Sequence, residues 1–145
     1  MSVTISGSGQ IVKQVIYATY ATTGTNGSST FATTGLTATI TPTNSANKIL
    51  VLTHGVFYNG ASNRGIALQV TRGGTIIYTT IGAYSVYTGT TNIVVSLDVN
   101  TLDSPATTSA TTYTLNYASA DNNGSVTSNY NNTTSTMILM EIAYA

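Results

Sequence analysis

Residues 48–58 of the chain read Lys-Ile-Leu-Val-Leu-Thr-His-Gly-Val-Phe-Tyr. In an extended strand, successive side chains point to opposite sides of the sheet. One side of this segment carries Ile49, Val51 and Phe57. The other side carries Leu50, Leu52 and Val56. The segment is apolar on both sides and has no helical spacing, so it predicts a long β-strand.

Shorter segments with the same alternation, bounded by turn residues, recur along the rest of the chain. The expected strands are Ile11–Tyr20, Ser29–Thr33, Leu36–Thr41, Arg64–Thr71, Thr75–Thr80, Tyr84–Tyr87, Asn92–Val99, Thr111–Ser119, Ser125–Tyr130 and Thr136–Tyr144. Gly73-Gly74 predicts a hairpin between two of them, because glycine readily adopts the positive φ angles of a primed turn. About ten short strands at regular spacing predict an all-β fold, a β-sandwich or jelly roll. We expect residues 1–10 to form an N-terminal arm and residues 11–145 to form this single domain.

The composition excludes several classes of function. Only 6% of the 145 residues are charged, against about 25% in an average protein. The chain has 4 basic residues (Lys and Arg) and 4 acidic residues (Asp and Glu), so its formal net charge is zero. Such a chain has no basic patch for nucleic acid and no apolar run long enough for a membrane span. It contains no cysteine, so disulfides and cysteine-based metal sites are excluded, and no cofactor is expected.

Two of the expected strands, Ile11–Tyr20 and Thr136–Tyr144, are apolar on both sides. One side of each would pack the core, and the other needs a cover, for which a second copy of the chain is the economical choice. The alternative is a loop of the same chain. The candidate residues of the interface between copies are Val15, Tyr17, Met137, Leu139 and Glu141.

Glu141 is an acid among Met, Leu and Ile, so we expect a buried ion pair or a hydrogen bond between chains. The long cations available to it are Lys13, Lys48, Arg64 and Arg72.

Three stretches carry a resemblance to a known group of proteins. In order, they are Ile40-Thr-Pro-Thr-Asn-Ser-Ala-Asn-Lys-Ile-Leu-Val51, Leu102-Asp-Ser-Pro-Ala-Thr-Thr-Ser-Ala-Thr-Thr-Tyr-Thr114 and Met137-Ile-Leu-Met-Glu-Ile-Ala143. From about Val12 to the C-terminus the chain resembles a β-module of tail-fibre and virion-surface proteins of cyanophages and marine phages. The resemblance implies a location on the virion and a homotrimer.

The sequence has a short arm and no shaft repeat or coiled-coil heptads, which favours a capsid decoration (cement) protein over a tail fibre. We therefore expect a non-enzymatic bacteriophage virion structural protein on the head exterior, contacting itself and the major capsid protein or another virion protein. Val3, Thr4 and Ile5 are candidate residues for docking on the virion, because a short alternating segment can pair with an exposed sheet edge. The alternative function is a receptor-binding module that recognises a glycan on the host surface.

Residues with catalytic potential are few. His54 is the only histidine, and Asp98 or Asp103 could orient it in a serine hydrolase triad, but no Gly-x-Ser-x-Gly motif is present. Asp98 and Asp103 could also form the carboxylate pair of a glycosidase. We expect His54 to be structural and the acids to serve a turn near the end of a strand.

The remaining candidate ligand-binding residues lie in loops that combine tyrosine and asparagine, a combination that suits a sugar through ring stacking and amide hydrogen bonds. They are Tyr58, Asn59, Tyr84, Tyr87 and Tyr130. The alternative is that these are ordinary polar loops of a β-sandwich.

Overall fold

A computed structural model describes residues 2–4, 11–62, 64–80, 85–120 and 124–143. The strands are β1 (Ser2–Thr4), β2 (Val12–Tyr20), β3 (Gly24–Asn26), β4 (Ala32–Ile40), β5 (Lys48–Asn59), β6 (Arg64–Arg72), β7 (Thr75–Thr79), β8 (Val86–Thr88), β9 (Ile93–Asp103), β10 (Thr111–Ser119), β11 (Val126–Ser128) and β12 (Ser135–Ile142). A single 3-10 turn, η1 (Tyr130–Asn132), precedes β12. Within these ranges no helix has the length and apolar character needed to cross a membrane.

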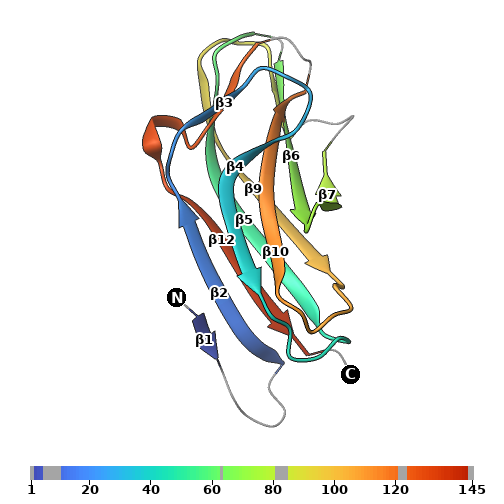
Figure 1. The fold of residues 1–145 in the computed structure, drawn as a ribbon. Coiled ribbons are helices and arrows are strands. Elements are labelled where there is room, and N and C mark those ends of the chain that lie inside the picture. The colour runs from blue at the N-terminus through green and yellow to red at the C-terminus, as the bar shows by residue number, and fades with distance from the viewer. Residues whose placement is uncertain (1, 5–10, 63, 81–84, 121–123, 144–145) are drawn as a thin grey trace.

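The strands form two antiparallel sheets that face one another (Figure 1). We call the 7-stranded sheet, with the order β1-β2-β12-β5-β11-β3 and β9 on the other side of β5, sheet A. The 5-stranded sheet, with the order β4-β10-β6-β7 and β8 also on β6, is sheet B. The all-β sandwich predicted from the sequence is confirmed.

Strand β5 organises sheet A, because β12 and β11 pair with successive parts of one edge and β9 pairs with the whole of the other. It is the strand predicted from residues 48–58, and it extends one residue further, to Asn59, for a length of 12 residues.

Several boundaries differ from the expectation. The segment expected at 36–41 belongs to a longer strand, β4, which begins at Ala32. Of the segment expected at 29–33, only residues 32 and 33 lie in that strand. The pairing of β4 with β10 shifts register between Thr114 and Asn116. The short strand β3 was not among the expected strands. Strand β9 continues four residues past the expected end at Val99, to Asp103. Segment Ser2–Thr4 of the expected arm pairs with β2 of its own chain.

The core lies between the sheets and consists of aliphatic side chains with three buried aromatic rings. Phe57 of sheet A and Tyr117 of sheet B meet across it with ring centroids 6.0 Å apart. The large, fully buried residues include Leu36, Ile40, Ile49, Ile66, Leu68, Tyr113, Leu115, Met137 and Leu139. This core fixes which side of each strand faces inward.

Sheets A and B also meet at Tyr20 of β2 and Gly35 of β4. Gly35 has a φ of +88°, and a Cβ atom added there would lie 2.2 Å from the Tyr20 ring. Only glycine allows both this backbone conformation and this close approach.

We expect Gly35→Ala to lower the free energy of unfolding by about 2–4 kcal/mol, from overpacking against Tyr20 and from the positive φ. Gly74→Ala is the matched control, because Gly74 also has a φ of +88° but no atom within 4 Å of the added Cβ. The control should lose only the conformational part, about 1 kcal/mol. Urea unfolding measures both, and equal losses would show that the contact with Tyr20 contributes nothing.

Candidate assembly surface

The side of sheet A that faces away from sheet B carries a cluster of large apolar side chains, with Lys48, His54 and Asp98 on the same side. Alternation along the strands and the register between them place one set of large side chains on this side. We call it the outer apolar face: Val15, Tyr17, Leu50, Leu52, Leu102, Ile138, Met140 and Ile142. All are half-buried or exposed, and Tyr17 and Leu102 are 48% and 59% exposed. They form rows across the sheet, because Val15, Met140, Leu50 and Leu102 are paired in register.

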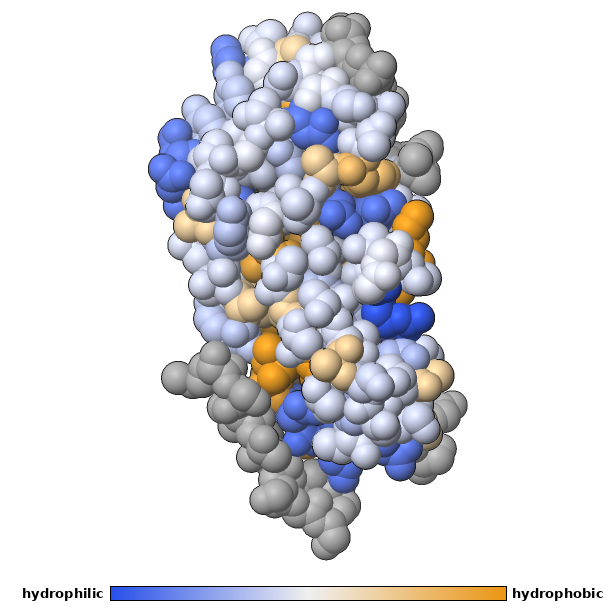
Figure 2. Space-filling view, in the orientation of Figure 1, coloured by the Kyte–Doolittle hydropathy of each residue, from blue (hydrophilic) through white to orange (hydrophobic). Residues whose placement is uncertain are grey.

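Sheet B carries a different kind of outer surface. Threonines line β4 and β10 there, and Thr39 and Thr112 join their hydroxyls across the strands at 2.8 Å. Figure 2, with these strands in front, shows a surface that is mostly pale, neither strongly hydrophobic nor strongly hydrophilic. The chain therefore presents threonine to water on one sheet and large apolar side chains on the other. Contiguous apolar patches of this kind mark interaction sites.

The predicted interface residues divide between the two sides of sheet A. Val15 and Tyr17 lie on the outer apolar face, and their place in an interface between copies remains a prediction. Met137, Leu139 and Glu141 are each 0% exposed and point into the core, so their assignment to an interface between copies was wrong. The alternation showed two apolar sides without showing which one is inside. The residues that share the outer side with Val15 and Tyr17 are their register partners, Met140 and Ile138.

Glu141 pairs with neutral donors and not with a cation. Oε1 accepts hydrogen bonds from the Thr43 backbone N–H (2.6 Å), the Thr43 hydroxyl (2.8 Å) and Asn47 Nδ2 (2.7 Å). Oε2 accepts one from Gln14 Nε2 at 2.7 Å. The expectation of an ion pair is therefore corrected. The carboxylate holds the loop between β4 and β5, which carries the chain from sheet B to sheet A.

Burial alone would raise the pKa of Glu141, but the hydrogen bonds from Asn47, Gln14 and Thr43 outweigh it and hold that pKa below its ordinary value. The group is therefore a carboxylate at neutral pH. Its charge is compensated by dipoles that the folded chain has already oriented.

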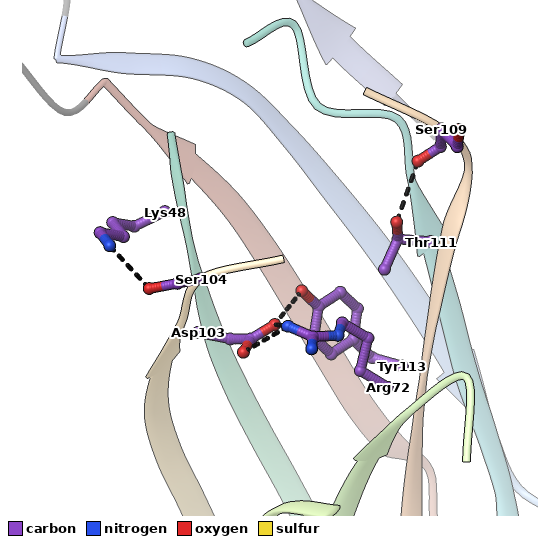
Figure 3. A network of polar contacts seen from close by, with 7 residues as sticks. All are labelled: Lys48, Arg72, Asp103, Ser104, Ser109, Thr111 and Tyr113. Carbon is purple, nitrogen blue, oxygen red and sulfur yellow. Dashed lines mark hydrogen bonds and ion pairs between the residues drawn. The ribbon is translucent and has the colours of Figure 1, made fainter. Parts of the chain in front are cut away.

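A second buried carboxylate, Asp103, joins the two sheets at the same end of the sandwich (Figure 3). Arg72 Nη1 of β6 lies 2.7 Å from both oxygens of Asp103, and the Tyr113 hydroxyl of β10 donates to Oδ2 at 2.7 Å. Burial is the larger cause that raises the pKa of Tyr113, and the hydrogen bond to Asp103 raises it further. The hydroxyl therefore stays protonated. Beside this cluster, Lys48 Nζ donates to Ser104 Oγ at 2.7 Å.

Of the residues considered for catalysis, the structure brings His54 and Asp98 together and leaves Asp103 apart from them. His54 Nδ1 lies 2.8 Å from Asp98 Oδ1, and both side chains are exposed, 45% and 58%. Asp98 lies within β9 and points outward, whereas Asp103 ends the strand and points into the core. The expected turn role is corrected: Asp98 lies within β9 and bonds to His54, and Asp103, the last residue of β9, bonds to Arg72 and Tyr113. Across the described ranges no three metal-binding side chains cluster.

Of the glycan candidates, the structure brings two together. Tyr58 and Tyr130 stack with ring centroids 4.6 Å apart and 13° between their planes, and the Tyr58 hydroxyl donates to Asn92 Oδ1 at 2.6 Å. Asn59 is 1% exposed and points inward, so it cannot contact a sugar. Tyr87 is exposed but belongs to sheet B, and Tyr84 lies outside the described residues.

The candidate docking segment adds a strand to sheet A. Val3 pairs with Val15 and Thr4 with Gln14, at the edge of β2. Ile5 lies outside the described residues. Docking of this segment on a virion remains a prediction.

No protein-family model matches the chain, and no curated protein matches it either. Among solved structures it is similar to VP2 of the infectious bursal disease virus subviral particle, with 16% identity and a TM-score of 0.48 over 90% of this chain and 37% of that one. Thus the chain spans well under half of that protein. The Gx strain of the same virus gives 14% identity and a TM-score of 0.46 over 99% and 42% of the two chains.

A pilus protein of Bacillus endospore appendages gives 13% identity and a TM-score of 0.40 over 97% of this chain and 98% of that one. All three TM-scores lie below 0.5, so the chain's own surfaces are what bear on its function.

We expect Glu141→Gln to destabilise the fold by about 1–3 kcal/mol at pH 7. The substitution replaces one carboxylate oxygen, an acceptor, with an amide N–H₂ group, a donor, whereas the surrounding groups that bond to Glu141 are themselves donors. Because the folded-state pKa of Glu141 lies below its unfolded value, the wild type should lose stability as the pH falls through the folded value. The variant should lose less over the same interval. Urea unfolding at a series of pH values measures both effects, and parallel pH profiles would contradict the assignment.

Proposed function

We propose that this chain is a non-enzymatic structural protein of a bacteriophage virion, a capsid decoration protein on the head exterior that stabilises the capsid. The observation that carries the proposal is the outer apolar face, a patch of large side chains on the side of sheet A away from the core. A partner that covers it removes apolar surface from water, which is worth about 25 cal/mol per Å².

The shape of the face suits a cementing role. It is built on regular strands whose inner side is anchored by core packing and by Glu141, so little order has to be gained on binding. It holds few charged groups, in keeping with a charged fraction of 6%. Binding through such a face depends on shape and apolar contact more than on electrostatic steering. The resemblance to virion-surface modules of phages supplies the location.

A map of intact virions tests the proposal directly. We expect density for this chain at regular positions on the head, in a copy number fixed by the capsid lattice. Particles that lack the chain should release their genome at a lower temperature. Density confined to the tail, with heads of unchanged stability, would contradict the decoration role.

We expect Tyr17→Asp to weaken binding to undecorated heads at least tenfold, because it places a charge in the outer apolar face at an exposed position. Tyr87→Asp is the matched control, since Tyr87 is 52% exposed and lies on sheet B. Co-sedimentation with undecorated particles measures both variants. Equal binding by Tyr17→Asp and wild type would remove the outer apolar face from the mechanism.

A second candidate function, recognition of a host glycan by a tail-fibre module, is favoured by the stacked pair Tyr58 and Tyr130 beside Asn92. Aromatic rings with nearby amides bind sugars by stacking and hydrogen bonding. Tyr130→Ala should then abolish adsorption to host cells while leaving binding to heads unchanged. Loss of adsorption would favour this function over decoration.

A further inference from the structure

Strand β9 forms an open edge of sheet A. It is 11 residues long, and among the described residues β5 is its only pairing partner. The Val99 N–H points toward β5, since it donates to Thr53 Oγ1 at 3.1 Å. Because N–H groups alternate in direction along a strand, those of Ser96, Asp98 and Asn100 point away from the sheet. These groups are available to another strand.

The edge lacks most of the features by which proteins prevent strands from pairing. It contains no proline or lysine, and its register with β5 runs from Ile93 to Asp103 without a bulge. Its one exposed charged side chain is Asp98, which is already paired with His54. A long, regular and nearly uncharged edge is suited to extending the sheet.

The side chains of β9 are arranged symmetrically about Asp98. In antiparallel pairing with a second β9, one register overlaps all 11 residues, and it places Asp98 opposite Asp98. In this register Ser96 faces Asn100 of the second copy, and Val94 faces Leu102. Val94 and Leu102 are 53% and 59% exposed, so the pairing brings together two exposed apolar side chains at each end. Such cross-strand pairs stabilise sheets.

We propose that β9 is an interface with a second copy of this chain, formed by antiparallel β9–β9 pairing about a two-fold axis through Asp98. The pairing joins the two copies of sheet A into one continuous sheet. A two-fold axis perpendicular to the sheet keeps both outer apolar faces on the same side, which doubles the surface offered to a third partner. The contact generates a dimer, whereas the resemblance implies a trimer. It does not depend on what covers the outer apolar face.

The register has one unfavourable pair, the opposed Asp98 carboxylates, and this pair supplies a sharp test. In a homodimer of Asp98→Lys two lysines face each other, as two aspartates do in the wild-type homodimer. In a mixed dimer of wild type and Asp98→Lys an acid faces a base. We expect the mixed dimer to be tighter than either homodimer by roughly twofold to tenfold. Sedimentation velocity with one species fluorescently labelled measures the three dissociation constants. A mixed dimer no tighter than the homodimers would overturn the register.

Backbone pairing is tested separately. Ser96→Pro removes an N–H that points to the open edge, so it should abolish dimerisation while the thermal unfolding midpoint stays close to that of the wild type. Ser96→Thr keeps the N–H and is the matched control, which should dimerise like the wild type. Dimers that survive Ser96→Pro but disappear in Tyr17→Asp would place the second copy on the outer apolar face and overturn the proposal. A wild-type protein that remains monomeric at high micromolar concentration would overturn it as well.

Discussion

Two carboxylates in the inner row of sheet A, Glu141 and Asp103, constrain the whole sandwich. Both are register partners of Ile49, on opposite sides of β5. A buried carboxylate is costly unless it is fully hydrogen-bonded, so each one fixes the groups around it. Glu141 fixes the crossover loop through Thr43 and Asn47, whereas Asp103 fixes sheet B through Arg72 and Tyr113. Removal of either carboxylate leaves several oriented donors without an acceptor. Each carboxylate therefore couples the position of its neighbouring residues to the packing of the sheets.

This anchoring explains how an apolar surface can be presented without collapse of the fold. The inner sides of β5 and β12 are held by the core and by the carboxylates at one end, so their outer sides are free to differ in chemistry. The outer side of sheet B carries threonines, whose hydroxyls hydrogen-bond with water and whose β-branched side chains favour strand conformation. Sheet A presents Leu, Ile and Met in the same structural position. This difference between the two sheets is why we propose the outer apolar face as the surface for a partner.

Much of the fold could be predicted from alternation and turn residues, including the long strand at 48–58 and the hairpin at Gly73-Gly74. The direction in which each strand faces could not, because Thr136–Tyr144 is apolar on both sides. The charge of Glu141 suggested a buried ion pair or a hydrogen bond between chains, yet its donors are neutral groups of the same chain, about a hundred positions earlier in the sequence. Asp98 and Asp103 were expected to lie near the end of β9 and beyond it, and an unrecognised continuation of that strand put them on opposite sides of the sheet. The close contact between Tyr20 and Gly35 could not be predicted either, because it forms only when the two sheets pack together.

The scarcity of charge links the fold to the way the chain can associate. Proteins usually keep sheet edges apart with lysine and other charged residues. In this chain only 6% of the residues are charged, so few are available for that role at the sheet edges. On β9 a single exposed acid, Asp98, lies in the middle of the strand, and its carboxylate is 2.8 Å from His54 Nδ1. The contacts left to such a chain are apolar faces and backbone hydrogen bonds, both of which depend on regular strands. Because β5 pairs with β9 and also carries Leu50 and Leu52 of the outer apolar face, the two proposed contacts, one at the edge and one on the face, act on the same sheet.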